Sequence, residues 1–225
     1  MSPAEQTEIE RKYDVDETAV VPDLVGTTPR DPSAGGAGRD LRVARVDVDP
    51  PAHLAATYHD APGRPLLGGR VTLRRRTGGH DAGWHLKLPP TGAGAGRREV
   101  HAPLGEAGDG VPAELLERVA DRLDGRDVAP VLVLETTRTA HRLRAADGTE
   151  LAELADDAVS ASEPETGTRR SWREWEVELA PGLDGVDGDA LLEAVEAVLR
   201  SAGAVPSSSR SKLARGLGEE PLPGA

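Results

Sequence analysis

The chain has 225 residues and a formal net charge of −12, and it contains neither cysteine nor phenylalanine. The lack of cysteine excludes disulfides, thiolate metal ligands and thiol nucleophiles. The acidic balance argues against a nucleic-acid partner, because binding to a nucleic-acid backbone needs a net basic surface. No apolar run is long enough to span a bilayer, and residues 1–6 lack the features of a signal peptide, so we expect a cytoplasmic protein without a membrane partner.

The first charged stretch of the chain predicts a β-strand. Side chains alternate along a strand, so Glu8, Glu10 and Lys12 would share one face. A charged face normally points to solvent, but several later stretches repeat the pattern, which favours a barrel with a charged lumen. Residues 27–38, which follow, are rich in Gly, Pro, Ala and Thr and are expected to form a flexible loop.

A β-hairpin is predicted over residues 69–88, with its turn at residues 78–81. Alternation places Arg74 and Arg76 on one face of the first strand, and Lys87 on the matching face of the return strand. Cations on adjacent strands repel one another unless an anion lies between them. The hairpin therefore predicts a pocket for a small polyanion, which a protein of acidic net charge can still hold locally.

The rest of the chain is dominated by strands. The expected elements are strands over residues 41–49, 53–60, 97–101, 131–143, 150–160 and 172–179, and helices over residues 112–123, 189–202 and 210–217. Hairpins at short spacing favour a closed antiparallel barrel, because closure removes exposed sheet edges. The expected fold class is α+β, mainly β: an eight-stranded closed antiparallel β-barrel with a few flanking helices. It would form one domain over residues 1–217, followed by a disordered tail over residues 218–225.

Other charged and aromatic residues are expected to have structural roles. Glu174 shares a face with Glu176 but lies near a strand end, where we expect it to be solvated. Three tryptophans are expected to pack on the outside of the barrel beneath helices: Trp84, Trp172 and Trp175. Four histidines lack metal-ligand spacing and are expected at the surface or in turns: His53, His59, His80 and His101.

An ordered set of motifs spans nearly the whole chain. It comprises Glu8-Ile9-Glu10-Arg11-Lys12, Leu73-Arg74-Arg75-Arg76, Trp84-His85-Leu86-Lys87-Leu88-Pro89, Glu174-Trp175-Glu176-Val177-Glu178 and Ser209-Arg210-Ser211-Lys212-Leu213. On these motifs the chain resembles the CYTH domain, or triphosphate tunnel metalloenzyme, family. That family includes class IV adenylyl cyclases, thiamine triphosphatases and inorganic triphosphatases. The resemblance implies an eight-stranded antiparallel barrel whose charged tunnel holds a triphosphate and a divalent metal ion.

The resemblance also implies roles for residues at the motif positions. The basic residues expected to bind the triphosphate are Lys12, Arg74, Arg76, Lys87, Arg138 and Lys212. The carboxylates expected to bind or orient the metal are Glu8, Glu10, Asp156, Glu176 and Glu178. The expected catalytic group combines Lys12 with four of these carboxylates: Glu8, Glu10, Glu176 and Glu178. Further candidates for the tunnel wall are Glu99, Arg97, Arg142 and His85.

The residue types agree with this chemistry. Carboxylate oxygens without cysteine are hard ligands, which favour Mg²⁺ or Mn²⁺ over Zn²⁺. The expected reaction is in-line attack of water on the terminal phosphoryl group, which needs no covalent nucleophile. The motifs look most like those of bacterial CYTH domains, and such bacterial members are most similar to inorganic triphosphatases. The leading hypothesis is therefore hydrolysis of inorganic triphosphate to pyrophosphate and phosphate.

Three alternatives stay open. A thiamine triphosphatase would need an aromatic or apolar pocket at the tunnel mouth, and the chain has few aromatic residues. A class IV adenylyl cyclase typically carries a His-Phe pair before the opening motif, where this chain has Glu5, Gln6 and Thr7. The third alternative is a non-catalytic module that binds polyphosphate or nucleotide. Carboxylates in its pocket would lower its affinity for such an anion, which counts against this alternative.

The resemblance is greatest to CYTH domains of bacterial proteins that carry a C-terminal CHAD domain. No His-rich helical region of that kind follows Lys212 in the sequence. The chain is therefore expected to be either a stand-alone protein or a fragment whose partner is a CHAD domain. The sequence does not decide the oligomeric state.

Overall fold

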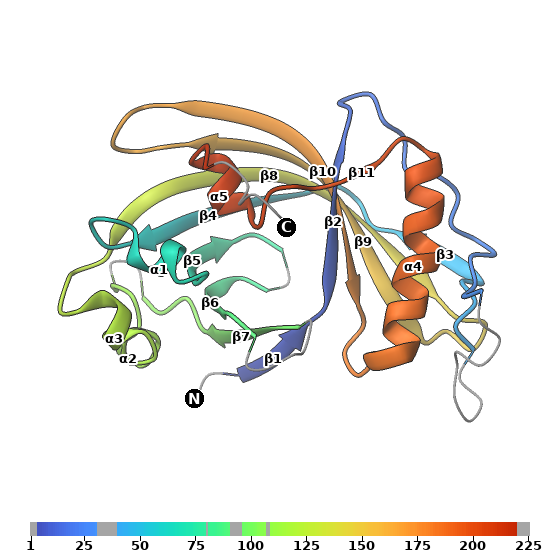
Figure 1. The fold of residues 1–225 in the computed structure, drawn as a ribbon, viewed down its shortest axis with the longest axis horizontal. Coiled ribbons are helices and arrows are strands. Elements are labelled where there is room, and N and C mark those ends of the chain that lie inside the picture. The colour runs from blue at the N-terminus through green and yellow to red at the C-terminus, as the bar shows by residue number, and fades with distance from the viewer. Residues whose placement is uncertain (1–3, 31–39, 80, 91–95, 107–108, 220–225) are drawn as a thin grey trace.

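A computed structural model describes residues 4–30, 40–79, 81–90, 96–106 and 109–219 of the chain (Figure 1). Most of the predicted loop over 27–38 and of the predicted tail over 218–225 lies outside the described residues. The strands are β1 (Ala4–Glu8), β2 (Glu10–Val15), β3 (Arg45–Val48), β4 (Ala52–Asp60), β5 (Thr72–Thr77), β6 (Gly83–Leu88), β7 (Arg97–Ala102), β8 (Ala129–Arg144), β9 (Glu150–Ser162), β10 (Arg169–Leu179) and β11 (Val205–Pro206).

All of these strands belong to one antiparallel sheet. Its path runs β1-β7-β6-β5-β4-β8-β9-β10-β2-β11, and β3 pairs with β8 beside that path. Strands β1 and β2 are consecutive in the chain, with only Ile9 between them, yet β1 pairs with β7 and β2 pairs with β10. One N-terminal segment therefore contributes a strand near each end of the sheet.

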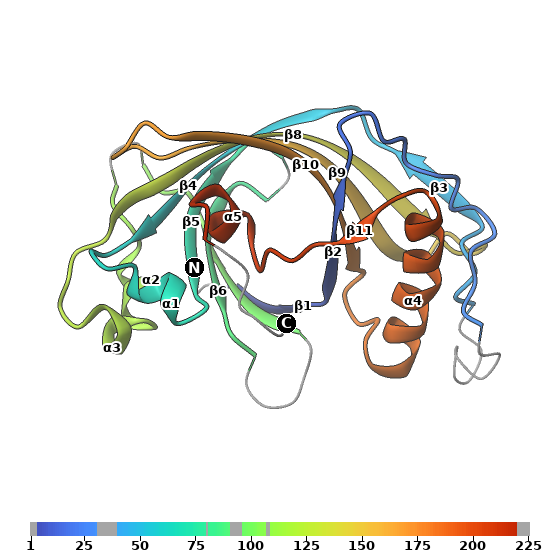
Figure 2. The same ribbon diagram turned by 45° about the horizontal axis from the view of Figure 1, so that its top comes forward.

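The sheet curls into a half-barrel (Figures 1 and 2), and the prediction of a closed eight-stranded barrel is wrong in this respect. The prediction treated Glu8 to Lys12 as one strand, whereas the segment changes its pairing partner at Ile9. Alternation along a sequence reports which residues share a face. It does not report which strands pair, and pairing decides closure. The mainly β class with few helices is confirmed.

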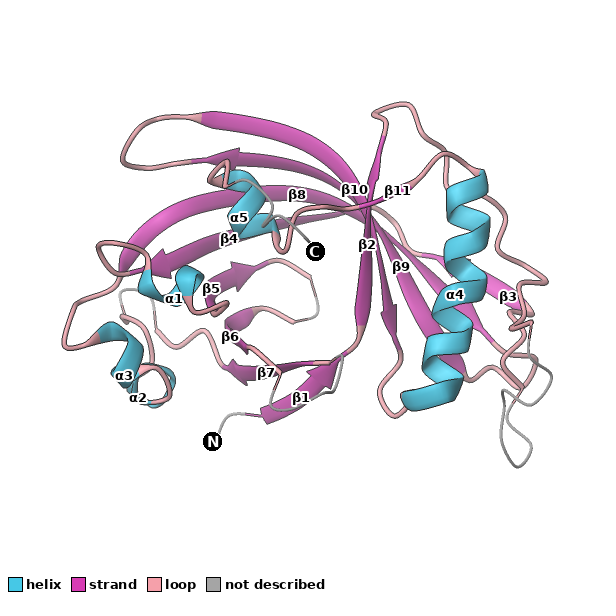
Figure 3. Cartoon of the chain, viewed as in Figure 1, coloured by secondary structure: helices cyan, strands magenta, loops and turns pink. Residues whose placement is uncertain are grey.

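The helices lie against the two faces of the sheet (Figure 3). They are α1 (Pro65–Gly68), α2 (Ala113–Glu117), α3 (Ala120–Leu123), α4 (Gly185–Ser201) and α5 (Lys212–Gly216). The predicted single helix over 112–123 is interrupted because Val119 has φ −127° and ψ 10°, outside the helical region. None of the described helices is both long and apolar enough to cross a membrane.

Helices α2 to α4 cover the outer face of the sheet, and α1 contributes Leu66 to that face and Leu67 to the inner one. Trp175 and Val177 of β10 are buried in one cluster with Leu191 and Leu199 of α4. A second cluster joins the outward side chains of β5, β6 and β7 to α1, α2 and α3, with Trp84 among its members. Burial of these side chains removes apolar surface from water and fixes the opposite residues of each strand on the inner face. The predicted outward positions of Trp84 and Trp175 are confirmed.

Helix α5 lies inside the curl instead (Figures 1 and 2). Its Leu213 and the adjoining Leu217 are buried with Leu132 of β8 and Trp172 of β10. Trp172 therefore faces inward, and its predicted place on the outside is wrong. The helix begins after Ser211, whose hydroxyl oxygen accepts a hydrogen bond from the backbone nitrogen of Ala214 at 3.1 Å. This cap places Lys212 at the first position of a helix that is packed within the sheet.

Candidate active site

The inner face of the sheet encloses a pocket of about 800 Å³. Its lining includes eight Lys or Arg side chains and nine Asp or Glu side chains. A second pocket, of about 690 Å³, is lined by only three such charged residues, so the charge is concentrated in the first. The predicted site residues that line the charged pocket are Glu8, Glu10, Lys12, Arg74, Arg76, His85, Lys87, Arg97, Glu99, Arg138, Arg142, Glu176, Glu178 and Lys212.

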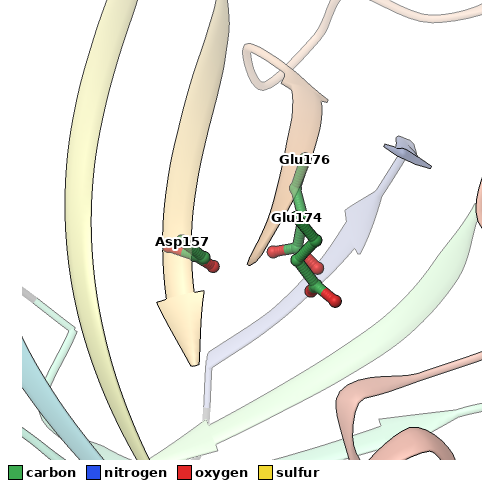
Figure 4. A group of neighbouring side chains, drawn as sticks. All are labelled: Asp157, Glu174 and Glu176. Carbon is green, nitrogen blue, oxygen red and sulfur yellow. The ribbon is translucent and has the colours of Figure 1, made fainter. Parts of the chain in front are cut away.

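One side of the pocket is a cluster around Asp157, on strands β8, β9 and β10. Arg138 donates hydrogen bonds to both carboxylate oxygens of Asp157, at 2.7 and 2.6 Å, and one to Glu176 at 3.1 Å. The Lys212 ammonium lies 2.9 Å from Asp157, 2.7 Å from Glu176 and 2.5 Å from Glu174. Figure 4 shows Asp157 on one strand and Glu174 and Glu176 on the neighbouring one. One carboxylate oxygen of each of the three residues lies within 4.8 Å of the others.

The electrostatics of this cluster favour the charged forms. Burial alone would raise the pKa of Asp157, but the charges of Lys212 and Arg138 outweigh it and hold that pKa below its usual value. The same balance holds the pKa of Glu176 well below its usual value, with Lys12 adding to the two other cations. Lys12 contacts Glu176 directly, because the two residues are cross-strand partners on β2 and β10. Asp157 and Glu176 are therefore ionised and paired with cations, whereas burial raises the pKa of Glu174.

A second group of acids in the pocket, on β1, β2 and β10, has divergent proton affinities. Burial and a hydrogen bond with Glu99 raise the pKa of Glu8 to about 8, against the opposing charge of Lys87. Burial likewise raises the pKa of Glu178 to about 7. For Glu10, burial is outweighed by the charges of Lys12 and Lys87, which hold its pKa at about 2. Neighbouring carboxyl groups in one pocket thus differ widely in the pH at which they ionise.

The prediction for Asp156 is wrong about its position. Asp156 accepts hydrogen bonds from Arg173 at 2.8 and 2.6 Å and from the indole nitrogen of Trp175 at 3.1 Å, and it does not line the pocket. The next residue, Asp157, lies opposite Arg138 and occupies the inner face. The sequence of β9 left the phase open because Leu154 and Ala155 are both apolar, although they point to opposite faces.

The prediction that Glu174 is solvated is also wrong. Its side chain is 4% exposed, and one of its oxygens accepts a hydrogen bond from the Trp172 indole nitrogen at 2.5 Å. Arg215 of α5 lies 3.5 Å from the same carboxylate and stacks over the Trp172 ring at 5.0 Å. Alternation with Glu176 indicated the inner face, but the burial comes from α5, which lies far along the chain. Lining residues that the sequence analysis did not select include Asp49, Asp81, His101 and Glu153.

A family model described as the CYTH domain matches residues 33–217, most of the chain. The chain belongs to the CYTH domain family. The pocket described above is thus the inner face of a CYTH domain. The match begins after β1 and β2, although both strands pair within the same sheet.

Similar proteins include two from Mycobacterium tuberculosis, both described as uncharacterized: MT2285 of strain CDC 1551 / Oshkosh and Rv2226 of strain H37Rv. Each is 41% identical to this chain over 227 residues, which cover 96% of the chain and 41% of the relative. The chain therefore spans about two-fifths of the length of these curated relatives.

Solved structures share the fold of this CYTH domain at low sequence identity. The "putative adenylate cyclase" of Bacillus halodurans has a TM-score of 0.59 and 17% identity, covering 94% of this chain and 97% of its own. The PH1819 protein of Pyrococcus horikoshii OT3 has a TM-score of 0.50 and 17% identity, covering 95% and 99%. At such identities the likeness concerns the fold alone.

Proposed function

We propose that this CYTH domain hydrolyses a triphosphate, and that its substrate is inorganic triphosphate, which it cleaves to pyrophosphate and phosphate. The supporting observation is the convergence of cations: in a chain of net charge −12, eight Lys and Arg side chains line one pocket. A triphosphate is a compact polyanion. Cations held in a partly desolvated pocket attract it more strongly than cations in water would.

The residues proposed to bind phosphate oxygens are Lys12, Arg74, Arg76, Lys87, Arg138 and Lys212, all of which line the pocket. Several of them are paired with carboxylates, as Arg138 is with Asp157. Phosphate oxygens would compete with these carboxylates for the same donors. The carboxylates released in this way would be available to a cation that binds together with the triphosphate.

The acidic residues fit a hard divalent metal ion such as Mg²⁺ or Mn²⁺. The donors are carboxylate oxygens, and those of Asp157, Glu174 and Glu176 already lie within 4.8 Å of one another. We propose that Glu8, Glu10, Glu176 and Glu178 hold the metal, and that Asp157 takes the role expected of Asp156. When bound, such a metal supplies charge neutralisation at the phosphate oxygens.

The residues of the chain would then act by positioning and by charge. The oxygen of a water molecule forms a bond to the terminal phosphorus while the bridging P–O bond breaks. Pyrophosphate leaves with the electron pair of that bond, and the attacking water gives up a proton to the solvent. Fixed cations on the inner face stabilise the charge that develops on the oxygens. No serine, cysteine or histidine nucleophile is required.

Phosphate release tests this proposal. The substrates are inorganic triphosphate, ATP and thiamine triphosphate, each with Mg²⁺, with Mn²⁺ and with EDTA. We expect metal-dependent cleavage that is fastest for inorganic triphosphate. A preference for ATP or thiamine triphosphate would overturn the assignment of inorganic triphosphate as substrate, while the proposal of triphosphate hydrolysis would stand. Tight triphosphate binding without turnover in any metal would overturn hydrolysis and identify a binding module.

A matched pair of variants checks the pocket assignment. Glu176→Gln removes one buried charge next to Lys12 and Arg138 and is expected to lower kcat/KM by about 100-fold. Glu165→Gln removes an exposed charge in the loop between β9 and β10 and is expected to leave kcat/KM unchanged. Equal losses in the two variants would contradict the assignment.

A further inference from the structure

His85 of β6 is a nearly fully buried ring on the pocket wall, and both of its nitrogens face oxygen atoms. The residue is 2% exposed. Nε2 lies 2.8 Å from the backbone carbonyl oxygen of Asp81, and Nδ1 lies 2.9 Å from Oε1 of Glu99. A carbonyl oxygen can only accept, so Nε2 donates to Asp81. Nδ1 and the Glu99 carboxyl then share one proton between them, which ties the carboxyl group to the ring.

Arg74, the cross-strand partner of His85 on β5, has weak partners by comparison with Arg138. Its Nη2 lies 3.9 Å from Oε1 of Glu99, beyond hydrogen-bond distance, and its Nη1 donates to the hydroxyl of Tyr58 at 3.5 Å, the outer limit. Its buried Nε has no hydrogen-bond partner among the described residues. Arg138, in contrast, makes two short hydrogen bonds to a single carboxylate.

The same oxygen of Glu99 faces both His85 and Arg74. At 2.9 Å it is bonded to the imidazole, and at 3.9 Å it is only near the guanidinium. A buried guanidinium attracts a free carboxylate strongly, since bidentate pairs of this kind are among the stronger hydrogen bonds in proteins. Without the imidazole, Glu99 would keep only its hydrogen bond with Glu8 and the attraction of Lys87, and the charge of Arg74 would draw it across that gap to the guanidinium donors.

We propose that His85 is a positioning residue that holds Glu99 away from Arg74 and so keeps the Arg74 guanidinium available to a phosphate group. The inference rests on the proposed function, because it concerns how the same pocket binds its polyanion. His85 need not touch the substrate in this role. Its second hydrogen bond has a separate effect: it fixes the backbone of Asp81, whose carboxylate accepts a hydrogen bond from Arg76 at 2.7 Å.

Two substitutions separate the two hydrogen bonds of the ring. His85→Gln keeps a donor near the position of Nε2 and loses the contact with Glu99. His85→Asn keeps a donor near the position of Nδ1 and loses the contact with Asp81. The measured quantity is the Kd for inorganic triphosphate by calorimetry in EDTA, which does not depend on turnover. We expect His85→Gln to raise the Kd about tenfold and His85→Asn to raise it less, because the Asn variant keeps the bond that holds Glu99; a larger effect of His85→Asn would overturn the positioning of Glu99 by His85.

The double variant His85→Gln/Glu99→Gln supplies the decisive comparison. A neutral amide at position 99 cannot form an ion pair with Arg74, so the change at position 85 should alter the Kd less than about twofold against Glu99→Gln alone. Such a rescue cannot come from misfolding of the His85→Gln protein. A tenfold loss in both backgrounds, or no loss in either, overturns the positioning role.

The function and the inference fail in different ways. If the wild-type protein cleaves triphosphate and His85→Gln binds it as tightly as the wild type, only the role of His85 is overturned. Suppose that the wild-type protein binds triphosphate without cleaving it, and that the single and double variants at positions 85 and 99 give the expected Kd values. Hydrolysis is then overturned and the positioning role is supported. If the wild-type protein does not bind triphosphate at all, the proposed function is overturned, and the role of His85 with it.

Discussion

Lys212 of α5 and Asp157 of β9 lie 2.9 Å apart, Nζ to Oδ2, and Asp157 is fully buried. The pair joins a short helix near the end of the described chain to the middle of the sheet. Because Lys212 also contacts Glu174 and Glu176, a single ammonium group balances several buried carboxylates. Helix α5 is therefore held inside the curl by charge as well as by its apolar residues.

Replacement of Lys212 by Met is expected to lower the free energy of unfolding by about 3 kcal/mol, since it leaves buried carboxylates without their cation. Urea unfolding measures the change. Arg200→Met is the control, because the Arg200 side chain is 60% exposed and its pair with Glu196 is a surface ion pair. The expectation fails if the two variants lose similar stability.

Asp157→Asn and Asp156→Asn compare two adjacent carboxylates that point to opposite faces of β9. Asp157→Asn removes the partner of Arg138 in the pocket and is expected to reduce kcat/KM for triphosphate by about 100-fold. Asp156→Asn alters only the contacts with Arg173 and Trp175 outside the pocket and is expected to keep activity within about twofold. The reverse order of effects would restore the assignment made from the sequence.

Gly216→Ala is expected to displace α5 from the sheet. A Cβ atom at Gly216 would overlap Cδ2 of Leu132, which is fully buried and has little room to move. Overpacking of this kind costs about 1–3 kcal/mol, and the shift should raise KM for triphosphate because α5 carries Lys212. The control is Gly110→Ala, where a Cβ would meet no atom of the described residues within 4 Å. An unchanged KM in Gly216→Ala, with normal folding, would contradict a role for the placement of α5.

Titration of His59 is expected to lower the stability of the protein as the pH drops below 6.5, whereas the raised pKa values of Glu8 and Glu178 act in the opposite direction. Burial lowers the pKa of His59 from its usual 6.5, and the charge of Arg75 adds to this, against a hydrogen bond with the Thr57 backbone. Between the folded-state pKa of His59 and 6.5, the His59 side chain binds more protons in the unfolded chain than in the folded protein. The contribution of His59 to stability is therefore fully present above this pH window and is lost as the pH falls through it. Urea unfolding at about pH 7.5, 6.5 and 5.5 measures the slope.

His59→Gln should remove the His59 contribution and so reduce the loss of stability between pH 6.5 and 5.5, and His53→Gln, at an exposed position of the same strand, should not. A residual slope is expected in the His59 variant, because burial also lowers the pKa of His141. If His59→Gln and the wild-type protein give the same slope, titration of His59 does not limit stability.

Local alternation predicted the inner and outer faces wherever a strand carries its apolar residues at every second position. Lys87 and Trp84 of β6, and Glu176 and Trp175 of β10, lie on the predicted sides for this reason. The rule failed at Asp156, because the neighbouring apolar residues of β9 occupy both faces. Here the sequence had no periodicity from which to choose.

Features that depend on contacts between distant segments could not be predicted in this way. The burial of Glu174 and the inward position of Trp172 result from the packing of α5, whose residues lie some forty positions later in the chain. The exchange of partners at Ile9 likewise depends on β7 and β10, which the local pattern at Ile9 does not specify. How far the sheet closes, and where α5 packs within it, depend on contacts between segments that are distant in the sequence.

The division of the N-terminal segment at Ile9 has a practical consequence for any recombinant fragment of this domain. A fragment cut at residue 33, where the family match begins, would lack β1 and β2 and with them Glu8, Glu10 and Lys12. It would expose the hydrogen-bonding edges of β7 and β10 together, and unpaired edges of this kind invite aggregation. A synthetic peptide of residues 4–15, added in trans, would have to pair with both edges at once to restore the sheet.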